Sequence, residues 1–408
     1  MTPYYSDDLM TLYHGDCREV LPSLSDVDHV LTDPPYGLKF MGKGWDKEVP
    51  GVEFWTAIAE ACKPGAMMMA FGGTRTFHRL ACAIEDGGWE IRDTLCWLYG
   101  QGFPKSLDIS KAIDKAAGAK REVCGRKYVT KVTNGKALDY APDGQSSAQR
   151  AGSIAVTAPA SAAARQWNGW GTALKPAWEP IILAMKALDG TFAANAQRHG
   201  AAGLNVDGGR IGTERTTTRR TGSMGRGIYG GDARMGEIVN PAGRWPANVA
   251  LDEDAAAMLD EQSGHLPGIG LTGKNGGGKG CTTKSPEIYS AGWPKKSRWD
   301  SIMDNAGGGA SRFFYTAKAC RSDRGGRFNK HATVKPRDLL RWLLTLLATP
   351  TGGMCLDPFA GSGTTLVVCK ALGRKCMGIE LDEGHCEIAA KRLQGETAGM
   401  FDMVGATQ

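Results

Sequence analysis

A stiff acidic turn follows the first strand-like run of the sequence. The run covers Val27–Thr32 and is followed at once by Asp33, Pro34, Pro35 and Tyr36. Two consecutive prolines fix their own φ angles and restrict the residue before them, so the Asp33 carboxylate and the Pro34 carbonyl are held in place. These two acceptors and the flat ring of Tyr36 suit an exocyclic amino group on a planar base. The alternative is a rigid turn in which Asp33 caps backbone N–H groups.

A second motif, Leu356–Thr365 (LDPFAGSGTT), carries the chain from a strand through a glycine turn into a helix. Such a turn lets a ligand approach the backbone at a helix N-terminus. It matches neither the G-x-x-x-x-G-K-[ST] loop that cradles phosphates nor the G-x-G-x-x-G of dinucleotide folds. About 20 residues further on, Lys375–Leu381 contains Glu380, at the place where an acidic residue receives ribose hydroxyls in such folds. The pattern predicts a site for adenosine without a pyrophosphate.

Strands that alternate with helices surround both motifs. Pattern and length predict strands at 27–32, 66–71, 90–98, 178–186, 354–356 and 375–381. They predict helices at 52–63, 76–85, 338–347, 364–372 and 383–393. This alternation is typical of a parallel α/β sheet with helices on both faces. Both motifs then lie at carboxyl ends of strands, where open α/β sheets bind their ligands.

The two motifs together resemble those of the amino-group DNA methyltransferases that use S-adenosylmethionine. D-P-P-Y comes first and F-x-G-x-G last, with an insertion between them, which is the order of the class called beta. Further matching pieces are Leu12–Cys17 and His331–Pro336, although the family usually has Pro where Ala332 stands. The tracts GRWPANV at 243–249 and SRFFYTAKA at 311–319 are similar to phage- and prophage-borne members, either orphan or modification methylases.

This resemblance implies a cofactor, S-adenosyl-L-methionine, and a residue set that holds it. Phe359, Gly361 and Gly363 would line its methionine side, Glu380 would hold the ribose and Asp16 the adenine amino group. Thr333 and Lys335 would meet the methionine carboxylate, with His331 close by. The other residues of the predicted cofactor site are their neighbours Cys17, Asp33, Asp357, Ser362 and Thr364.

The same resemblance implies the reaction. The predicted catalytic residues are Asp33, Pro34, Pro35 and Tyr36. Hydrogen bonds to Asp33 and Pro34 would free the lone pair of an adenine N6 for direct, in-line methyl transfer, in which positioning and charge placement supply most of the catalysis. No covalent intermediate and no metal are expected. The base must leave the duplex to react; Tyr36 is the predicted stacking platform and Phe103 a candidate second wall.

The implied fold class is a circularly permuted, Rossmann-like sheet of seven mostly parallel strands with an inserted target-recognition region. Residues 1–190 would form the catalytic half, with a loop insertion at 118–172 that lacks periodicity. Residues 331–396 would form the cofactor half, and 397–408 a tail. Between them, 191–330 would recognise the target.

The middle of the chain is basic and rich in glycine. Residues 190–335 contain 21 Lys and Arg against 13 Asp and Glu, and residues 200–330 hold 26 of the 56 glycines. Charge alone fits a surface for a polyanion and a long, solvated insertion equally well. The resemblance implies that the polyanion is double-stranded DNA. Trp167, Trp170, Trp245 and Trp299 are expected in a core or an interface. The predicted DNA contacts are Arg215, Arg219, Arg220, Arg226, Lys295, Lys296 and Arg298.

Composition excludes several other classes of protein. With 42% hydrophobic and 23% charged residues the chain is globular, and its eleven cysteines form no C-x-x-C pair. A disulfide scaffold and a zinc ribbon are therefore not expected. The start MTPYYSDDLM does not predict a signal peptide, and no run near it predicts a membrane span, so a cytoplasmic location is expected. The oligomeric state is left open, with a homodimer as one alternative.

Three other functions compete with adenine N6 methylation. Cytosine N4 methylation poses the same chemical problem, but the family's N4 members more often have Ser in place of Asp33. Methyltransferases for RNA, protein or small molecules more often begin their tetrad with Asn, and the basic insertion argues against them. An inactive nucleic-acid-binding protein would not be expected to keep Asp33, Tyr36, Gly361 and Glu380.

Overall fold

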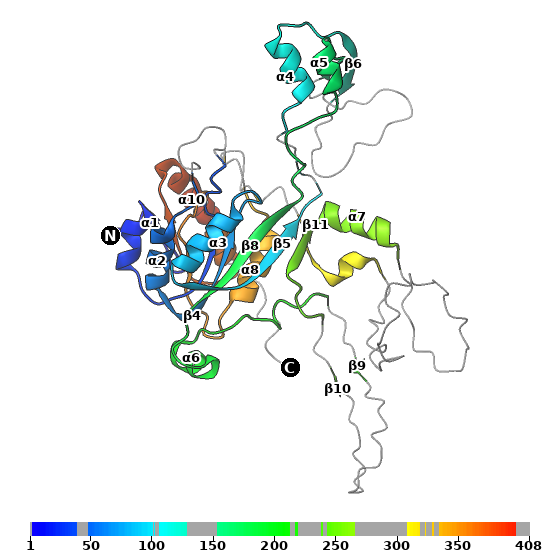
Figure 1. Cartoon of the computed structure of the whole chain (residues 1–408). Helices are drawn as coiled ribbons and strands as arrows, with labels where there is room; N and C mark the ends of the chain where they lie inside the picture. Colours follow the sequence, from blue (N-terminus) through cyan, green and yellow to red (C-terminus); the bar gives the residue numbers. More distant parts are fainter. Residues whose placement is uncertain are drawn as a thin grey trace, which may run out of the picture.

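The computed structural model is a ten-stranded, largely parallel sheet covered by helices, with a smaller arm standing away from it (Figure 1). The residues that it describes are 2–38, 48–100, 102, 106–128, 153–212, 217–218, 238–239, 243–265, 308–318, 323, 329 and 334–396.

The order of strands in the sheet is β1-β2-β14-β13-β3-β4-β8-β5-β11-β12. Only β1 and β8 run against their neighbours, and the other adjacent pairs are parallel. The bounds in chain order are β1 Tyr5–Ser6, β2 Met10–His14, β3 Val27–Thr32, β4 Cys62–Phe71, β5 Trp89–Leu98, β8 Trp178–Lys186, β11 Val249–Asp252, β12 Tyr315–Ala317, β13 Cys355–Asp357 and β14 Cys376–Glu380.

Two helical layers bury the two faces of this sheet. Strands β3, β4 and β8 are buried along nearly their whole length. In β4 and β8 the sequence shows this as the continuous apolar runs 66–71 and 181–185, whereas β3 also buries Asp28 and His29. One face packs against α8 (Arg337–Leu347), α9 (Thr364–Ala371) and α10 (Glu383–Gly395). The other packs against α1 (Cys17–Val20), the short 3-10 turn η1 (Leu21–Ser23), α2 (Val52–Ala61) and α3 (Phe77–Asp86).

The predicted fold class is confirmed, and every predicted strand and helix is present with ends shifted by a few residues. The sheet has ten strands instead of seven. One cause is the β1–β2 hairpin; another is that β11 and β12, from inside 191–330, extend the sheet in parallel through helix α7 (Glu253–Ser263). Strands of three or four residues are too short to show periodicity, so the sequence pattern predicted neither β11 nor β12. The division of the chain into domains stays a proposal.

The expected irregular insertion at 118–172 is also wrong where the structure describes it. Residues 123–128 and 153–157 form the hairpin β6–β7, and α5 (Ala162–Gln166) packs on α4 (Ile109–Ala116). The remaining described elements are α6 (Phe192–His199), the short 3-10 helix η5 (Ala310–Phe313) and the two-residue strands β9 (Thr217–Thr218) and β10 (Ile238–Val239). Within the described ranges, none of the helices has the length and apolar character needed to cross a lipid bilayer.

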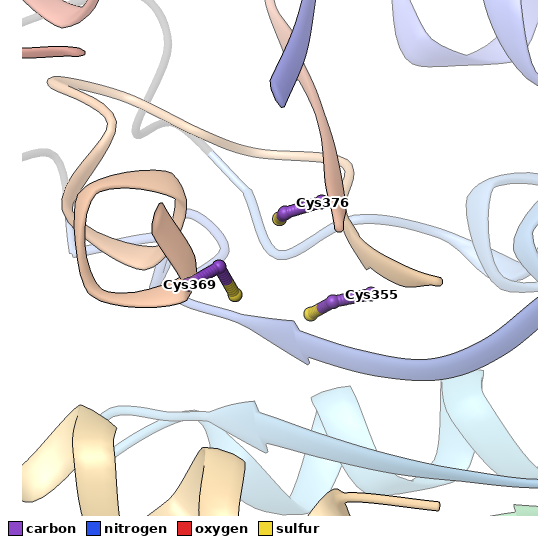
Figure 2. A group of neighbouring side chains, drawn as sticks. All are labelled: Cys355, Cys369 and Cys376. Carbon is purple, nitrogen blue, oxygen red and sulfur yellow. The ribbon is translucent and has the colours of Figure 1, made fainter. Parts of the chain in front are cut away.

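Three buried thiols meet at the end of the sheet opposite the glycine turn (Figure 2). Cys355 and Cys376 begin β13 and β14, and Cys369 faces them from α9; their Sγ atoms lie within 4.8 Å of one another. Buried free cysteines pack as small apolar groups. All three belong to the hydrophobic core between the sheet and helices α8, α9 and α10, and they lie outside the candidate site described next.

Candidate functional site

An open cavity of about 1880 Å³ lies along the carboxyl edge of the sheet. Because the strands other than β1 and β8 share one direction, the segments that follow β2, β3, β4, β13 and β14 meet there. The first residues of β8 join them, since β8 runs the other way. The volume exceeds that of a single small-ligand pocket, roughly 300–1,000 Å³, and leaves room for two ligands side by side. The cavity brings together the acidic turn at Asp33 and the glycine turn at Gly361.

The Asp33 carboxylate lies in a compact ionic network. Lys335 Nζ donates to Asp33 Oδ2 at 2.6 Å and to the Tyr36 hydroxyl at 3.0 Å. The Tyr36 hydroxyl in turn lies 2.7 Å from Asp33 Oδ1 and 3.1 Å from Glu179 Oε2. Glu179, the second residue of β8, also lies 3.4 Å from Lys335 Nζ. Two carboxylates thus share one ammonium, which leaves the network with a net negative charge.

The charges within this network fix its protonation. Burial lowers the pKa of Lys335, but the charges of Asp33 and Glu179 outweigh burial and raise it above the ordinary value, so the ammonium is retained. Burial and the same two carboxylates raise the pKa of Tyr36 well above its usual range, so the phenol stays neutral. A neutral hydroxyl and a fixed cation therefore hold the Asp33 carboxylate from two sides.

The glycine turn is built for close approach. Gly361 and Gly363 have φ angles of 52° and 74°, in the left-handed region that favours glycine. A Cβ on Gly363 would also lie only 2.7 Å from Ala389 Cβ, so α9 can start there only with glycine. Glu380 Oε2 accepts from Gly361 N–H at 2.7 Å, which ties the end of β14 to the turn. The structure therefore places Glu380 at the end of β14 beside the glycine turn and the N-terminus of α9, as predicted from the sequence.

A buried carboxyl joins the two halves of the site. Asp357 Oδ1 accepts from Thr32 Oγ1 at 2.8 Å and from Phe359 N–H at 3.2 Å, so the strand before the acidic turn is linked to the strand before the glycine turn. Burial raises the pKa of Asp357 to about 7, although hydrogen bonds from Thr365, Thr32 and the Phe359 N–H act in the opposite direction. The carboxyl is therefore partly protonated near neutral pH.

Asp357→Asn is expected to flatten the pH dependence of stability. The folded state binds the Asp357 proton more tightly than the unfolded state, so this group lowers the free energy of unfolding as pH rises from about 4 to about 7. The slope from one such group is at most about 1.4 kcal/mol per pH unit. Urea unfolding at pH 5 and pH 7.5 measures it, with exposed Asp8→Asn as control. Equal pH slopes in wild type and Asp357→Asn would contradict the assignment.

Asp16 and two aromatic rings form the far wall of the cavity. Arg18 Nη2 lies 2.6 Å from Asp16 Oδ2, and hydrogen bonds from Arg18 hold the pKa of Asp16 below its usual range. The Arg18 guanidinium also lies 4.4 Å from the centroid of the Phe54 ring. Phe54 in turn packs on Phe359, with ring centroids 5.9 Å apart. An anionic acceptor beside an apolar wall can receive an amino group on a flat ring.

The structure brings most of the described site residues to this one cavity. Lys335 is near Asp33 and Tyr36, and its predicted contact with the cofactor carboxylate stays a prediction. The cavity is lined by Asp16, Cys17, Asp33, Pro34, Pro35, Tyr36, Lys335, Asp357, Phe359, Gly361, Ser362, Thr364 and Glu380, with Gly363 in the same turn. The predicted residues outside the described ranges are Phe103, Arg215, Arg219, Arg220, Arg226, Lys295, Lys296, Arg298, His331 and Thr333.

Two residues of the cavity, Glu179 and Arg18, were not predicted from the sequence. Glu179 lies in a strand that reads as buried, and only the reversed direction of β8 brings it to Asp33. Arg18 had no signal beyond its place two residues after Asp16. Of the tryptophans expected in a core or an interface, Trp167, Trp170 and Trp245 are 40%, 60% and 67% exposed and lie outside the core, so for them the interface stays the prediction. Trp299 lies outside the described residues.

Comparison with known proteins gives a family and several relatives that match part of the chain. A sequence model of the DNA methylase family (N6_N4_Mtase) matches residues 27–391. The Type II methyltransferase M2.DpnII of Streptococcus pneumoniae is 49% identical over 67 residues, which are 16% of this chain and 25% of that protein. The Type II methyltransferase M.SmaI of Serratia marcescens is 49% identical over 63 residues, 15% of this chain and 21% of that protein. The chain thus matches a quarter or less of the length of these relatives.

Solved structures align over nearly the whole chain at low similarity. The cytosine-N4-specific PvuII DNA methyltransferase covers 98% of both chains at 12% identity, with a TM-score of 0.42. M1.HpyAVI covers 94% of this chain and 98% of its own, at 15% identity and a TM-score of 0.39.

Proposed function

Because the chain belongs to the DNA methylase family, we propose that it is a site-specific DNA methyltransferase. It transfers the methyl group of S-adenosyl-L-methionine to the exocyclic N6 of an adenine that has left the DNA duplex. One observation carries this proposal: the Asp33–Tyr36 turn and the glycine turn at Gly361, which lie more than 300 residues apart in sequence, line one cavity.

The residues of the cavity fit the proposed cofactor. Asp16 and the Phe54–Phe359 wall suit an adenine ring with its amino group, and Glu380 suits ribose hydroxyls. The turn lacks the lysine of a phosphate loop, in keeping with a nucleoside that has no phosphates. The net negative charge of Asp33, Glu179 and Lys335 suits a neighbouring cation. Bound there, S-adenosylmethionine would supply a methyl group activated on a sulfonium.

The chain's own residues position and polarise the acceptor. An adenine amino nitrogen is a poor nucleophile because its lone pair is delocalised into the ring. Asp33 and the Pro34 carbonyl accept its two N–H groups, which favours a more tetrahedral nitrogen and frees the lone pair. Methyl transfer to this nitrogen would leave a positive charge and one surplus proton on it. The negative network around Asp33 stabilises that charge, and Asp33 takes the surplus proton.

The base must leave the stack to reach this cavity. Tyr36 presents a ring whose position is fixed through its hydroxyl, and the Thr76 Oγ1 bond to the Tyr36 carbonyl at 2.6 Å holds its backbone. It remains our proposed stacking platform. Residues 191–330, with Arg215, Arg219, Arg220, Arg226, Lys295, Lys296 and Arg298, are proposed to contact the DNA around the target.

Mass spectrometry of nucleosides tests the function directly. Genomic DNA from cells that express the chain is expected to gain N6-methyladenine, and DNA from cells that express Asp33→Ala is expected to gain none. If N4-methylcytosine appears instead, the chain is a DNA methyltransferase whose target base is cytosine and not adenine. Unmodified DNA, with methyl transfer to RNA or protein from labelled cofactor, would contradict the proposal.

A further inference from the structure

A folded arm, formed by residues 106–128 and 153–176, stands at the mouth of the cavity. It leaves the sheet after β5 and returns at the start of β8, so both of its ends lie at the carboxyl edge (Figure 1). The returning segment Thr172–Trp178 lines the cavity, and Leu174 in it is 92% exposed. The two segments that join the arm to the sheet are held together by Lys175 Nζ, which donates to the Gly100 carbonyl. The arm is therefore rooted where a target base must enter.

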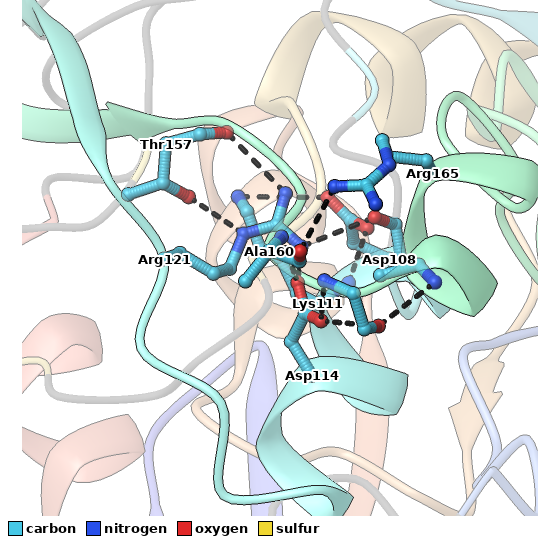
Figure 3. A network of polar contacts seen from close by, with 10 residues as sticks. Asp108, Lys111, Asp114, Arg121, Thr157, Ala160 and Arg165 are labelled. Atoms are coloured by element: carbon cyan, nitrogen blue, oxygen red, sulfur yellow. Dashed lines mark hydrogen bonds and ion pairs between the residues drawn. The ribbon is translucent and has the colours of Figure 1, made fainter.

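A polar centre holds the arm together (Figure 3). Arg121 Nη1 lies 2.8 Å from Asp114 Oδ2, and Arg121 Nε donates to Thr157 Oγ1 at 3.0 Å. Asp114 also accepts from the backbone N–H groups of Ala160 and Ser161. Burial raises the pKa of Asp114, but these hydrogen bonds and the charge of Arg121 outweigh it and lower the pKa to about 2. The carboxylate thus stays ionised and joins α4, α5 and the hairpin.

The surface of the arm is basic. Arg121 and Asp114 neutralise each other in the interior of the arm. The charge that the arm presents to a binding partner is therefore set by its exposed side chains. Lys111 and Lys115 are one turn apart on the same side of α4. The exposed cations of its described part are Lys111, Lys115, Lys120, Arg126, Arg165 and Lys175, against the exposed acids Asp108 and Glu122. A surplus of this size on a small unit attracts a polyanion.

Two indole rings are exposed beside the mouth. Trp167 and Trp170 pack edge to face with centroids 5.4 Å apart, yet remain 40% and 60% exposed. Trp170 precedes by two residues the first cavity-lining residue of this segment, Thr172. Large rings kept at a surface beside a cavity are typical of a recognition site rather than a core.

From charge, position and the exposed rings, we infer that the arm binds duplex DNA next to the flipped base. Its cations contact backbone phosphates, and Trp167 and Trp170 contact the sugars and bases beside the gap. This inference rests on the proposed function, and it adds a second DNA-binding surface to the one proposed for residues 191–330.

Salt dependence of DNA binding tests the cations. The triple variant Lys111→Gln, Lys115→Gln and Lys120→Gln is compared with wild type by fluorescence anisotropy on a duplex oligonucleotide at several salt concentrations. The slope of log affinity against log salt is expected to flatten by up to about 0.9 for each phosphate that the variant no longer neutralises. The matched control neutralises Arg92, Lys375 and Lys391, which are exposed and lie outside the cavity lining and outside residues 191–330, and it keeps the wild-type slope.

The indoles need a separate readout. Trp167→Ala with Trp170→Ala is expected to weaken binding and methyl transfer several-fold at an unchanged salt slope, because no charge is removed. S-adenosylmethionine affinity is the folding check for each variant. A salt slope equal to that of the wild type in the triple variant overturns the inference. A defect of that variant in dimerisation or in binding a protein would then assign the arm to that partner instead of DNA. A wild-type chain that binds no duplex at all overturns the proposed function together with it.

Discussion

Asp33→Ala is expected to slow methyl transfer by a factor of about 10³ or more and to change S-adenosylmethionine affinity little. The substitution removes the carboxylate that accepts the amino N–H and takes the proton, and it leaves the glycine turn and Glu380 untouched. Lys335 keeps Glu179 as a counter-charge at 3.4 Å, so the site is expected to remain folded. Tritium transfer from labelled cofactor and calorimetry of cofactor binding measure the two effects.

Asp33→Asn serves as the matched control. It keeps the shape and one acceptor but removes the charge, so it is expected to fall between wild type and alanine in rate. Turnover near the wild-type level in Asp33→Ala, with cofactor bound normally, would exclude Asp33 as a catalytic residue. A loss of cofactor binding equal to the loss of rate would instead place Asp33 in the cofactor site.

Local pattern was enough to predict most of the sheet. The wholly apolar run at 66–71 predicted a buried strand, and the strand, glycine turn and helix at 356–372 carry their own signals. Both chemical motifs lie at strand ends for the same reason. In a parallel α/β sheet the strands are fixed by the packing of the core, whereas the segments that follow them can vary in sequence and carry the chemistry. Asp33, Gly361 and Glu380 were therefore placed correctly at one edge.

What could not be predicted depends on tertiary pairing. Glu179 contacts Tyr36 because β8 runs against its neighbours, and no local pattern reports the direction of a strand. Strand β11 is held by pairing with β5, and β12 by pairing with β11, rather than by their own length. In the arm, buried Asp114 links α4 to the backbone of Ala160 and Ser161, and no local pattern reports a contact between segments so far apart in sequence.

Lys335→Met is expected to impair both stability and catalysis. It leaves Asp33 and Glu179 facing each other without their shared cation. Loss of one partner of a buried pair costs up to about 3–5 kcal/mol, but Asp33 and Glu179 are 31% and 23% exposed, so water screens part of it. A drop of about 1–3 kcal/mol in the free energy of unfolding is expected. The rate of methyl transfer is expected to fall about tenfold or more, because Asp33 is no longer oriented.

Two further variants separate the structural role from the catalytic one. Lys370→Met breaks a comparable pair, 2.8 Å from Asp7 and away from the cavity, and is expected to lower stability without slowing methyl transfer. Adding Glu179→Gln to Lys335→Met removes one of the two facing carboxylates, so stability is expected to recover in part while the rate stays low. If the rate recovers together with stability, Lys335 acts only by cancelling charge. If it does not, the lysine positions Asp33 for the incoming amino group.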